Sequence, residues 1–115
     1  MDAKLSIESK DSETITEVHF SGNMDTNTAP GAQGELNALI EAGKIQLVIN
    51  FEALNFISSA GLRVLLATAK RLKRENGGMA ICHLNETVQE VFDISGFISI
   101  FNVFQSQEEA ANFFS

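Results

Sequence analysis

Two adjacent hydroxyl side chains, Ser58 and Ser59, carry the clearest chemistry in the sequence. They follow an apolar segment, 45–51, that is typical of a buried strand, and they precede an amphipathic helical pattern over 62–74. The end of a strand in an open α/β sheet is a common place for a working surface. A serine there either caps unpaired backbone N–H groups or, after phosphorylation, holds a phosphate against them. From the residues alone, both readings stay open.

The rest of the chain predicts the elements that position these serines. We expect strands at 5–7, 14–20, 45–51, 79–84 and 98–104. We expect helices at about 30–43, at 62–74, between Asn85 and Gly96, and from a capping box at Ser106 to Phe113 and Phe114. The segment 52–57 is expected to link the third strand to the second helix.

This order, β-β-α-β-α-β-α-β-α, predicts an α/β class. Because helices alternate with strands after the first hairpin, the five-stranded sheet should be mixed and mostly parallel, with right-handed crossovers. Its four helices and five strands fit a single domain over residues 1–115.

Composition narrows the class of partner. The chain has 115 residues, 44% of them hydrophobic, and a formal net charge of −7. An acidic surface repels nucleic-acid phosphates and anionic lipid, so we expect a protein partner instead. The sequence shows no stretch long enough for a membrane span and no signal segment at Met1, and we expect a cytoplasmic location. The single cysteine, Cys82, is expected to be a buried core residue.

The sequence predicts no metal, cofactor or enzyme activity. His19 and His83 have no cysteine or carboxylate at ligand spacing, and no Gly-x4-Gly-Lys phosphate loop is present. Titratable residues do not cluster by sequence into a catalytic group. The basic run from Lys70 to Arg74 is interpreted as a solvated helix end, with a docking patch as the alternative.

Three short motifs occur in order along the chain. They are Gly-Asn-Met-Asp at 22–25, Ser-Ser-Ala-Gly-Leu at 58–62, and Val-Phe-Asp-Ile-Ser-Gly-Phe at 91–97. Together with the predicted architecture, they resemble the anti-sigma-factor antagonist family, whose domain is called STAS. One residue departs from the family pattern, because the aspartate that usually precedes the acceptor serine is Ser58 here.

The resemblance implies a phosphorylation switch. In such families the unphosphorylated antagonist binds an anti-sigma factor that is also a serine kinase, which releases the sigma factor. The kinase phosphorylates the motif serine, matched here by Ser59, and a serine phosphatase resets the cycle. The resemblance implies a partner-binding surface made of Met24, Asp25, Thr26, Ser58, Gly61, Leu62 and Arg63.

Other interpretations remain at this stage. Asp25 on its own fits an ordinary turn or cap residue between a strand and a helix. The same fold also fits a constitutive subunit of a lipid-transport ATPase complex, although the hydroxyl at Ser59 argues against that. A small-molecule or nucleotide sensor is the third alternative, and it would need a pocket with convergent polar groups.

Overall fold

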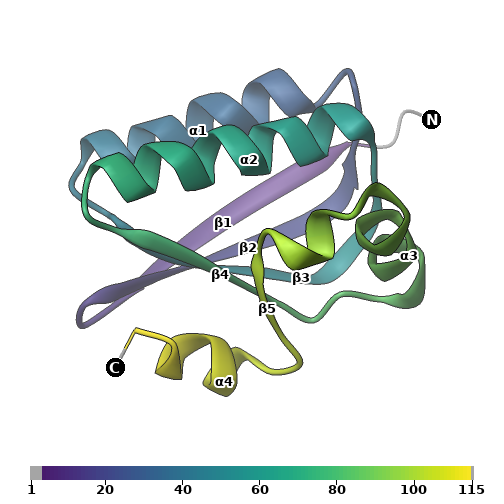
Figure 1. Ribbon diagram of the computed structural model, residues 1–115. Coiled ribbons are helices and arrows are strands. Elements are labelled where there is room, and N and C mark those ends of the chain that lie inside the picture. The colour runs from purple at the N-terminus through teal and green to yellow at the C-terminus, as the bar shows by residue number, and fades with distance from the viewer. Residues whose placement is uncertain (1–3, 115) are drawn as a thin grey trace.

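The computed structural model describes residues 4–114, and its elements follow the predicted order (Figure 1). The strands are β1 Leu5–Ser12, β2 Ile15–Met24, β3 Gln46–Ile57, β4 Gly78–Cys82 and β5 Asn102–Phe104. The helices are α1 Ala29–Glu41, α2 Ser59–Arg74, α3 Glu86–Ser95 and α4 Gln107–Asn112, with a 3₁₀ turn, η1, at Phe97–Ser99.

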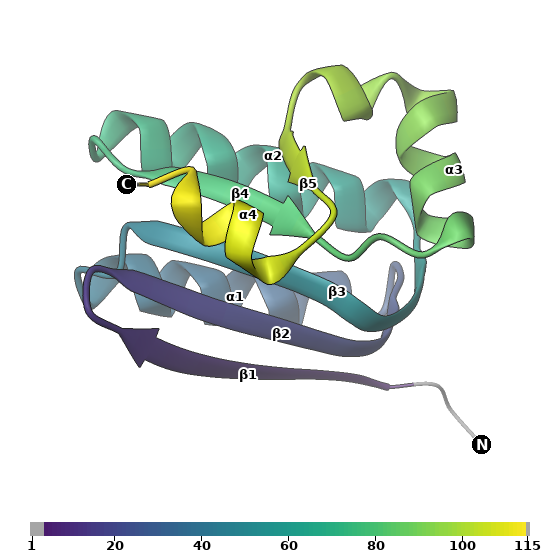
Figure 2. The ribbon, with the colours of Figure 1, turned by 90° about the horizontal axis from the view of Figure 1, so that it is seen from below.

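The five strands form one sheet in the order β1-β2-β3-β4-β5. β1 is antiparallel to β2, because a tight turn joins them, and each later pair is parallel. Helices α1 and α2 lie side by side on one face, and α4 crosses the other face (Figures 1 and 2). The predicted mixed α/β sheet is therefore confirmed.

The main core lies between the sheet and the pair α1 and α2. Alternate residues of the strands point into it, among them Val18, Phe20, Leu47, Ile49, Phe51 and Ile81, all with no exposed surface. A smaller cluster under α4 joins Val48, Ala80, Cys82 and Ala110 on the opposite face. This two-sided burial explains why 45–51 is apolar at five of its seven positions.

β3 is longer than the sequence predicted, and this correction determines where the serines lie. The segment 52–57, expected as a link, continues the strand because β2 also continues to Met24 and keeps pairing with it. The pairing tolerates two irregularities in register, and Gly22 has a φ of +109° at this point. A side chain at Gly22 would collide with the Lys4 carbonyl, so glycine is required there.

The other boundary predictions have different outcomes. Asn85 accepts a hydrogen bond from the Val88 amide at 2.8 Å, and Ser106 accepts one from the Glu109 amide at 3.1 Å, so both predicted caps are confirmed. The fifth strand is shorter than expected, because helical turns continue through η1 to Phe101. The fourth strand ends at Cys82, since the backbone of the next residue has a positive φ.

Candidate functional site

The ends of β2 and β3 bring the two predicted site segments together. Met24 is paired with Ile57 in the parallel register, and the Ser58 amide donates a hydrogen bond to the Met24 carbonyl at 2.8 Å. The loop that begins at Asp25 and the start of α2 therefore lie side by side at the carboxyl edge of the sheet. This is the edge at which open α/β sheets commonly bind their ligands.

Ser58 caps α2. Its backbone is extended, with φ −96° and ψ 175°, and its Oγ accepts a hydrogen bond from the Gly61 amide at 3.3 Å. Its carbonyl accepts the first helical hydrogen bond, from the Leu62 amide at 3.0 Å. Both bonds place Ser58 in the role that serine commonly fills at a helix start. The sequence predicted the helix to begin at Leu62, three residues later than it does.

Ser59 is the first residue of α2 and is exposed. Within residues 4–114 its hydroxyl has no hydrogen-bond partner, and the amides of Ser59 and Ala60 have no acceptor. These amides carry the positive end of the helix dipole, with no acidic residue in the first turn. A phosphate on Ser59 would therefore meet free N–H donors without displacing an existing side-chain contact.

Asp25 organises the loop before α1. Its Oδ1 accepts hydrogen bonds from the amides of Asn27 at 2.9 Å and Thr28 at 3.0 Å, while its own amide donates to Thr28 Oγ1 at 2.9 Å. These hydrogen bonds show that Asp25 stabilises the turn before α1, as the turn interpretation predicted. Although these hydrogen bonds hold it in the loop, Asp25 is only half-buried, and Thr26 beside it is exposed. Both side chains remain accessible next to the serines.

Three residues of the predicted partner surface lie mostly inside the protein. Met24 has no exposed surface and Leu62 is 3% exposed, so their side chains support the site from below and do not form its surface. Gly61 is buried too, and a Cβ there would lie 2.7 Å from Ile57 Cγ1 and 3.0 Å from Met24 Cγ. Its lack of a side chain lets α2 begin directly against the sheet.

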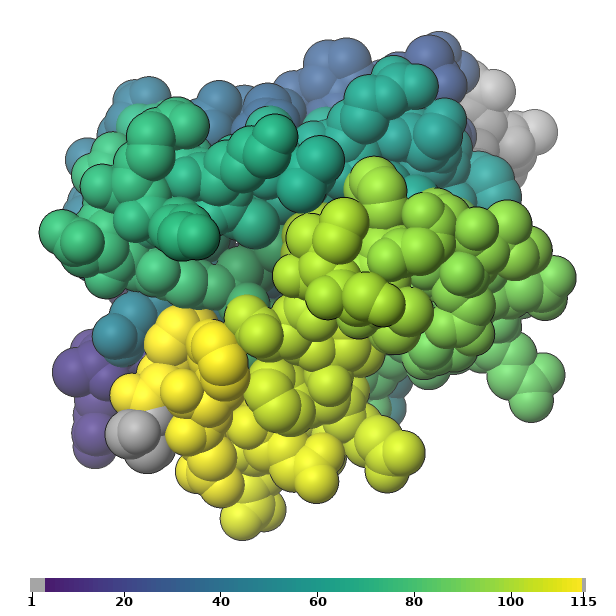
Figure 3. Space-filling view, viewed as in Figure 1, coloured from purple at the N-terminus to yellow at the C-terminus, as the bar shows by residue number. Residues whose placement is uncertain are grey.

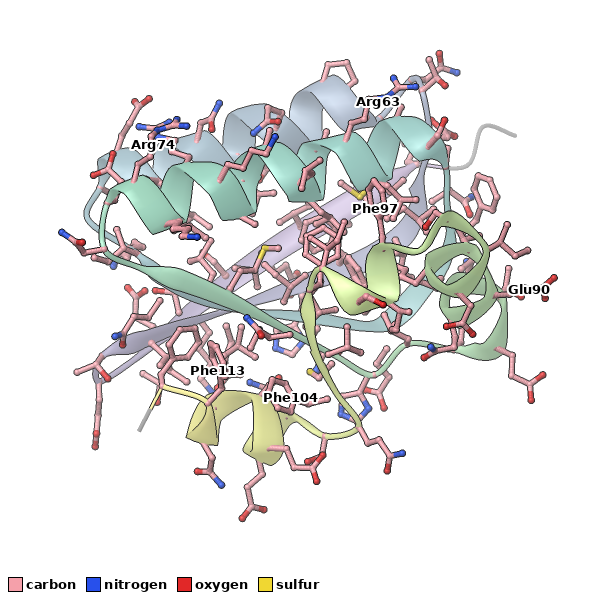
Figure 4. The ribbon with its side chains drawn as sticks, in the orientation of Figure 1. Arg63, Arg74, Glu90, Phe97, Phe104 and Phe113 are labelled. Atoms are coloured by element: carbon pink, nitrogen blue, oxygen red, sulfur yellow. The ribbon has the colours of Figure 1, made fainter. Side chains whose placement is uncertain are left out.

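Arg63 is exposed one turn after Ser59. Figure 4 shows it near the end of α2 that begins at the serines, pointing away from the sheet, with Arg74 at the opposite end of the helix. The accessible side chains of the predicted surface are therefore Asp25, Thr26, Ser58, Ser59 and Arg63, of which Asp25 and Ser58 are half-buried.

The sequence analysis missed Phe56. Its side chain is 42% exposed, although Leu54 and Ile57 on either side of it are fully buried. Regular strand alternation could not have signalled this, because the buried residues from Phe51 to Ile57 recur at every third position, where the register with β2 is irregular. An exposed aromatic ring three residues before Ser59 is a typical anchor for a protein partner.

Other chemistry is weaker in the described part of the chain. Residues 4–114 hold no group of three or more His, Cys, Asp or Glu side chains that could bind a metal ion.

Cys82 has no exposed surface, and burial, with a smaller contribution from the charges of Glu17 and Glu52, raises the pKa of its thiol to about 11. Across these same residues, no helix is both long enough and apolar enough to cross a membrane.

A cavity of about 690 Å³ lies at the ends of β4 and β5. Glu52, His83 and Gln105 contribute polar groups to its wall, and Phe101 and Phe104 contribute aromatic rings. No residue of the predicted site lines it. The polar pocket that a sensor requires is thus separate from the serine segment.

The chain is similar in sequence to known anti-sigma factor antagonists. An anti-sigma F factor antagonist of Paenibacillus polymyxa is 27% identical over 107 residues, which is 92% of each chain. A Bordetella bronchiseptica protein described as an anti-sigma factor antagonist, BtrV, is 43% identical over 90 residues, which is 78% of each chain.

Solved structures of anti-sigma factor antagonists also have a similar fold. The crystal structure of an anti-sigma factor antagonist from Mycobacterium paratuberculosis superposes with a TM-score of 0.86 at 24% identity, covering 95% of this chain and 92% of that one. The STAS domain family matches residues 6–110, which is nearly the whole described chain. This protein therefore belongs to the STAS domain family.

Proposed function

We propose that this protein is an anti-sigma factor antagonist controlled by phosphorylation of Ser59. In its unphosphorylated form it binds an anti-sigma factor that is also a serine kinase, and this binding releases a sigma factor. Phosphorylation breaks the complex, and a serine phosphatase restores the binding form. In this proposal the chain is a cytoplasmic binding protein and a kinase substrate, not an enzyme. Its similarity to BtrV and to other antagonists supports the assignment.

The observation that carries the proposal is the different use of two neighbouring hydroxyl groups. The Ser58 hydroxyl is engaged by the Gly61 amide, whereas the Ser59 hydroxyl is exposed and has no partner in residues 4–114. A kinase needs an accessible hydroxyl that makes no hydrogen bond on which the stability of the fold depends. Ser59 meets that requirement, whereas phosphorylation of Ser58 would disturb the cap bond to Gly61.

The surroundings of Ser59 explain how a phosphate would end binding. The exposed ring of Phe56 provides apolar surface that a partner must dehydrate. A phosphate adds about 1.5 to 2 negative charges at neutral pH, and burying that charge against an apolar or acidic partner is unfavourable. The start of α2 stabilises the phosphate in the free protein. Phosphorylation would thus weaken the complex without unfolding the domain.

The replacement of the family aspartate by Ser58 is compatible with this mechanism. Aspartate and serine are comparably good N-cap residues, so the Ser58 hydroxyl keeps the capping bond to Gly61. The presence of serine in place of aspartate also means that no carboxylate lies directly before the acceptor. The phosphate on Ser59 would then lack a neighbouring like charge.

Mass spectrometry tests the acceptor directly. The protein is incubated with ATP and cytosol from its own source, beside Ser59→Ala and Ser58→Ala variants. We expect one added phosphate that maps to Ser59, is absent from Ser59→Ala and is retained in Ser58→Ala. A phosphate on Ser58 in the wild-type protein would contradict the assignment. No phosphate on either serine, under conditions where a control kinase substrate is modified, would favour a constitutive binding role.

A further inference from the structure

A second accessible groove lies far from the serines. It has a volume of about 500 Å³ and is bounded by the last turns of α2, the start of β4, the residues from Ile100 to Asn102, and Phe113 and Phe114 after α4. Figure 3 shows this hollow between the green surface of α2 and β4 and the yellow surface of the C-terminal segment. From Ser59 to Lys73, α2 extends about 20 Å, so the groove does not overlap the proposed switch.

The groove is rich in exposed apolar side chains. Four large hydrophobic residues are exposed among residues 4–114, and two of them, Ile100 at 55% and Phe113 at 43%, line this groove. The Phe114 ring forms part of its floor, so close to Gly78 that a Cβ there would lie 3.2 Å from the ring. Phe113 packs on this ring and on Phe104, with ring centroids 5.1 and 5.7 Å apart, so its position is fixed (Figure 4).

The charge beside the groove is opposite to that of the whole protein. Lys70, Arg71, Lys73 and Arg74 supply four of the eight Lys and Arg residues of a chain whose net charge is −7. Arg71 forms ion pairs with Glu41 and with Glu75, the residue that follows α2. The other three cations form no ion pair within residues 4–114. Lys73 lines the groove, and no acidic residue among those described does so.

We propose that this groove is a second docking site, and that its occupant is an acidic amphipathic segment of another protein. Apolar side chains of that segment would cover Ile100 and Phe113, and its carboxylates would pair with Lys73 and Lys70. These two lysines are three residues apart, so they lie on the same face of α2. This inference goes beyond the proposed switch, because it adds a partner that can bind while Ser59 is free or phosphorylated.

The charge distribution favours a peptide segment over a membrane. A bilayer is an extended anionic plane, and it would meet the acidic residues around the basic cluster as well as the cluster itself. A peptide segment contacts the concave groove alone. A cavity of this size with a few fixed polar groups also suits a few inserted side chains better than a flat lipid surface.

Nuclear magnetic resonance can test the site with a defined probe. We would titrate the ¹⁵N-labelled full chain with a synthetic 14-residue helical peptide of leucine and glutamate that carries its leucines on one face. We expect amide shifts to concentrate at Lys73, Gly78 and Ile100. Lys73→Glu should weaken binding by about fivefold or more, since an attraction becomes a repulsion. Ile100→Ser should weaken it as well, and its folding is checked by thermal unfolding.

Lys10→Glu is the matched control, because it makes the same charge change at an exposed position of β1. We expect it to leave the peptide affinity nearly unchanged. Equal losses in Lys10→Glu and Lys73→Glu, or equal binding of a peptide with lysine in place of glutamate, would overturn the proposal. Binding to phosphatidylglycerol vesicles without binding to the peptide would show a membrane site instead. A dimer that Ile100→Ser dissociates would assign the groove to a second copy of this chain.

Discussion

The Oγ of Ser58 lies 3.3 Å from the amide nitrogen of Gly61, and this hydrogen bond separates two roles between adjacent serines. Ser58 secures the start of α2, while Ser59 presents an exposed hydroxyl one residue later. The stability of the helix start therefore depends on the Ser58 hydroxyl, and the proposed modification depends on the Ser59 hydroxyl. Substitutions at the two positions should have effects of different kinds.

Changes at Ser59 should alter partner binding and leave folding intact. Ser59→Ala is expected to keep the affinity for the anti-sigma factor and to lose phosphate acceptance. Ser59→Asp should weaken binding by about 2 kcal/mol or more, because it places a charge in a desolvated contact. Isothermal titration calorimetry with the purified partner measures both. Wild-type affinity in Ser59→Asp would show that charge repulsion is not how the complex is broken.

Ser58→Ala should have the complementary effect. Loss of the cap bond to Gly61 costs about 1 kcal/mol of unfolding free energy. For a domain of this size, that loss lowers the melting temperature by about 4 °C, which calorimetry detects. Phosphorylation of Ser59 should persist. Ser58→Asp should restore the stability, since a carboxylate accepts the same amide hydrogen bond; failure to restore it would mean that the cap is not the source of the loss.

Phe56 is expected to anchor the partner of the switch. Phe56→Ala should reduce affinity for the anti-sigma factor by about 2 kcal/mol or more, as truncation of a central aromatic residue often does. Phe113→Ala is the control, because that ring is 43% exposed against 42% for Phe56 and directly follows α4, away from the serines. The affinities of both variants for the anti-sigma factor show whether Phe56 is a local anchor or whether any loss of exposed apolar surface weakens binding. Equal losses would contradict the local role.

The sequence predicted the fold well where one signal dominated. Cap residues such as Asn85 and Ser106 were identified because their side chains satisfy helix amides locally. The extension of β3 to Ile57 was missed, because it depends on pairing with β2 through irregular register, and such pairing leaves no local pattern. The short β5 was overestimated for a related reason: the apolar residues from Ile98 onward suit a strand, but here the chain from Phe97 to Phe101 packs as a helical turn.

The site shows the same division. Motif spacing located Ser58 and Ser59 correctly at the beginning of a helix. It did not separate side chains that face outward from side chains that face inward, so Met24 and Leu62 were assigned to a surface from which burial removes them. Phe56 was overlooked because apolar residues near a predicted strand are usually core residues. Burial at these positions depends on how α2 packs on the sheet, which is a tertiary property.

Gly61→Ala should destabilise the protein even though alanine is the better helix former. A Cβ at this position would approach Ile57 Cγ1 to 2.7 Å and the Met24 carbonyl oxygen to 3.1 Å, and both residues are fully buried. Overpacking costs about 1 to 3 kcal/mol, which exceeds the gain of at most about 1 kcal/mol in helix propensity. Chemical denaturation measures the difference. Gly34→Ala in α1 is the control: nothing lies within 4 Å of its Cβ position, so it should stabilise.

Cys82 should be unreactive in the folded protein. Its thiol has no exposed surface, and burial raises its pKa to about 11. At pH 8 only about one thiol in a thousand would then be ionised, and the thiolate is the reactive species. Reaction with Ellman's reagent should be slow for the native protein and rapid in guanidinium chloride. Rapid reaction of the native protein would show that α4, which covers Cys82, opens readily.

The same pKa gives a dependence of stability on pH. The folded-state value lies above the ordinary value of 9.0, so folding favours the neutral thiol. This contribution to stability is fully present below pH 9 and is lost as the pH rises through about 11. Cys82→Ala removes the titrating group, so the unfolding free energy of the wild type should fall more steeply than that of the variant between these values. Parallel curves would mean that the thiol ionises equally in the folded and unfolded states.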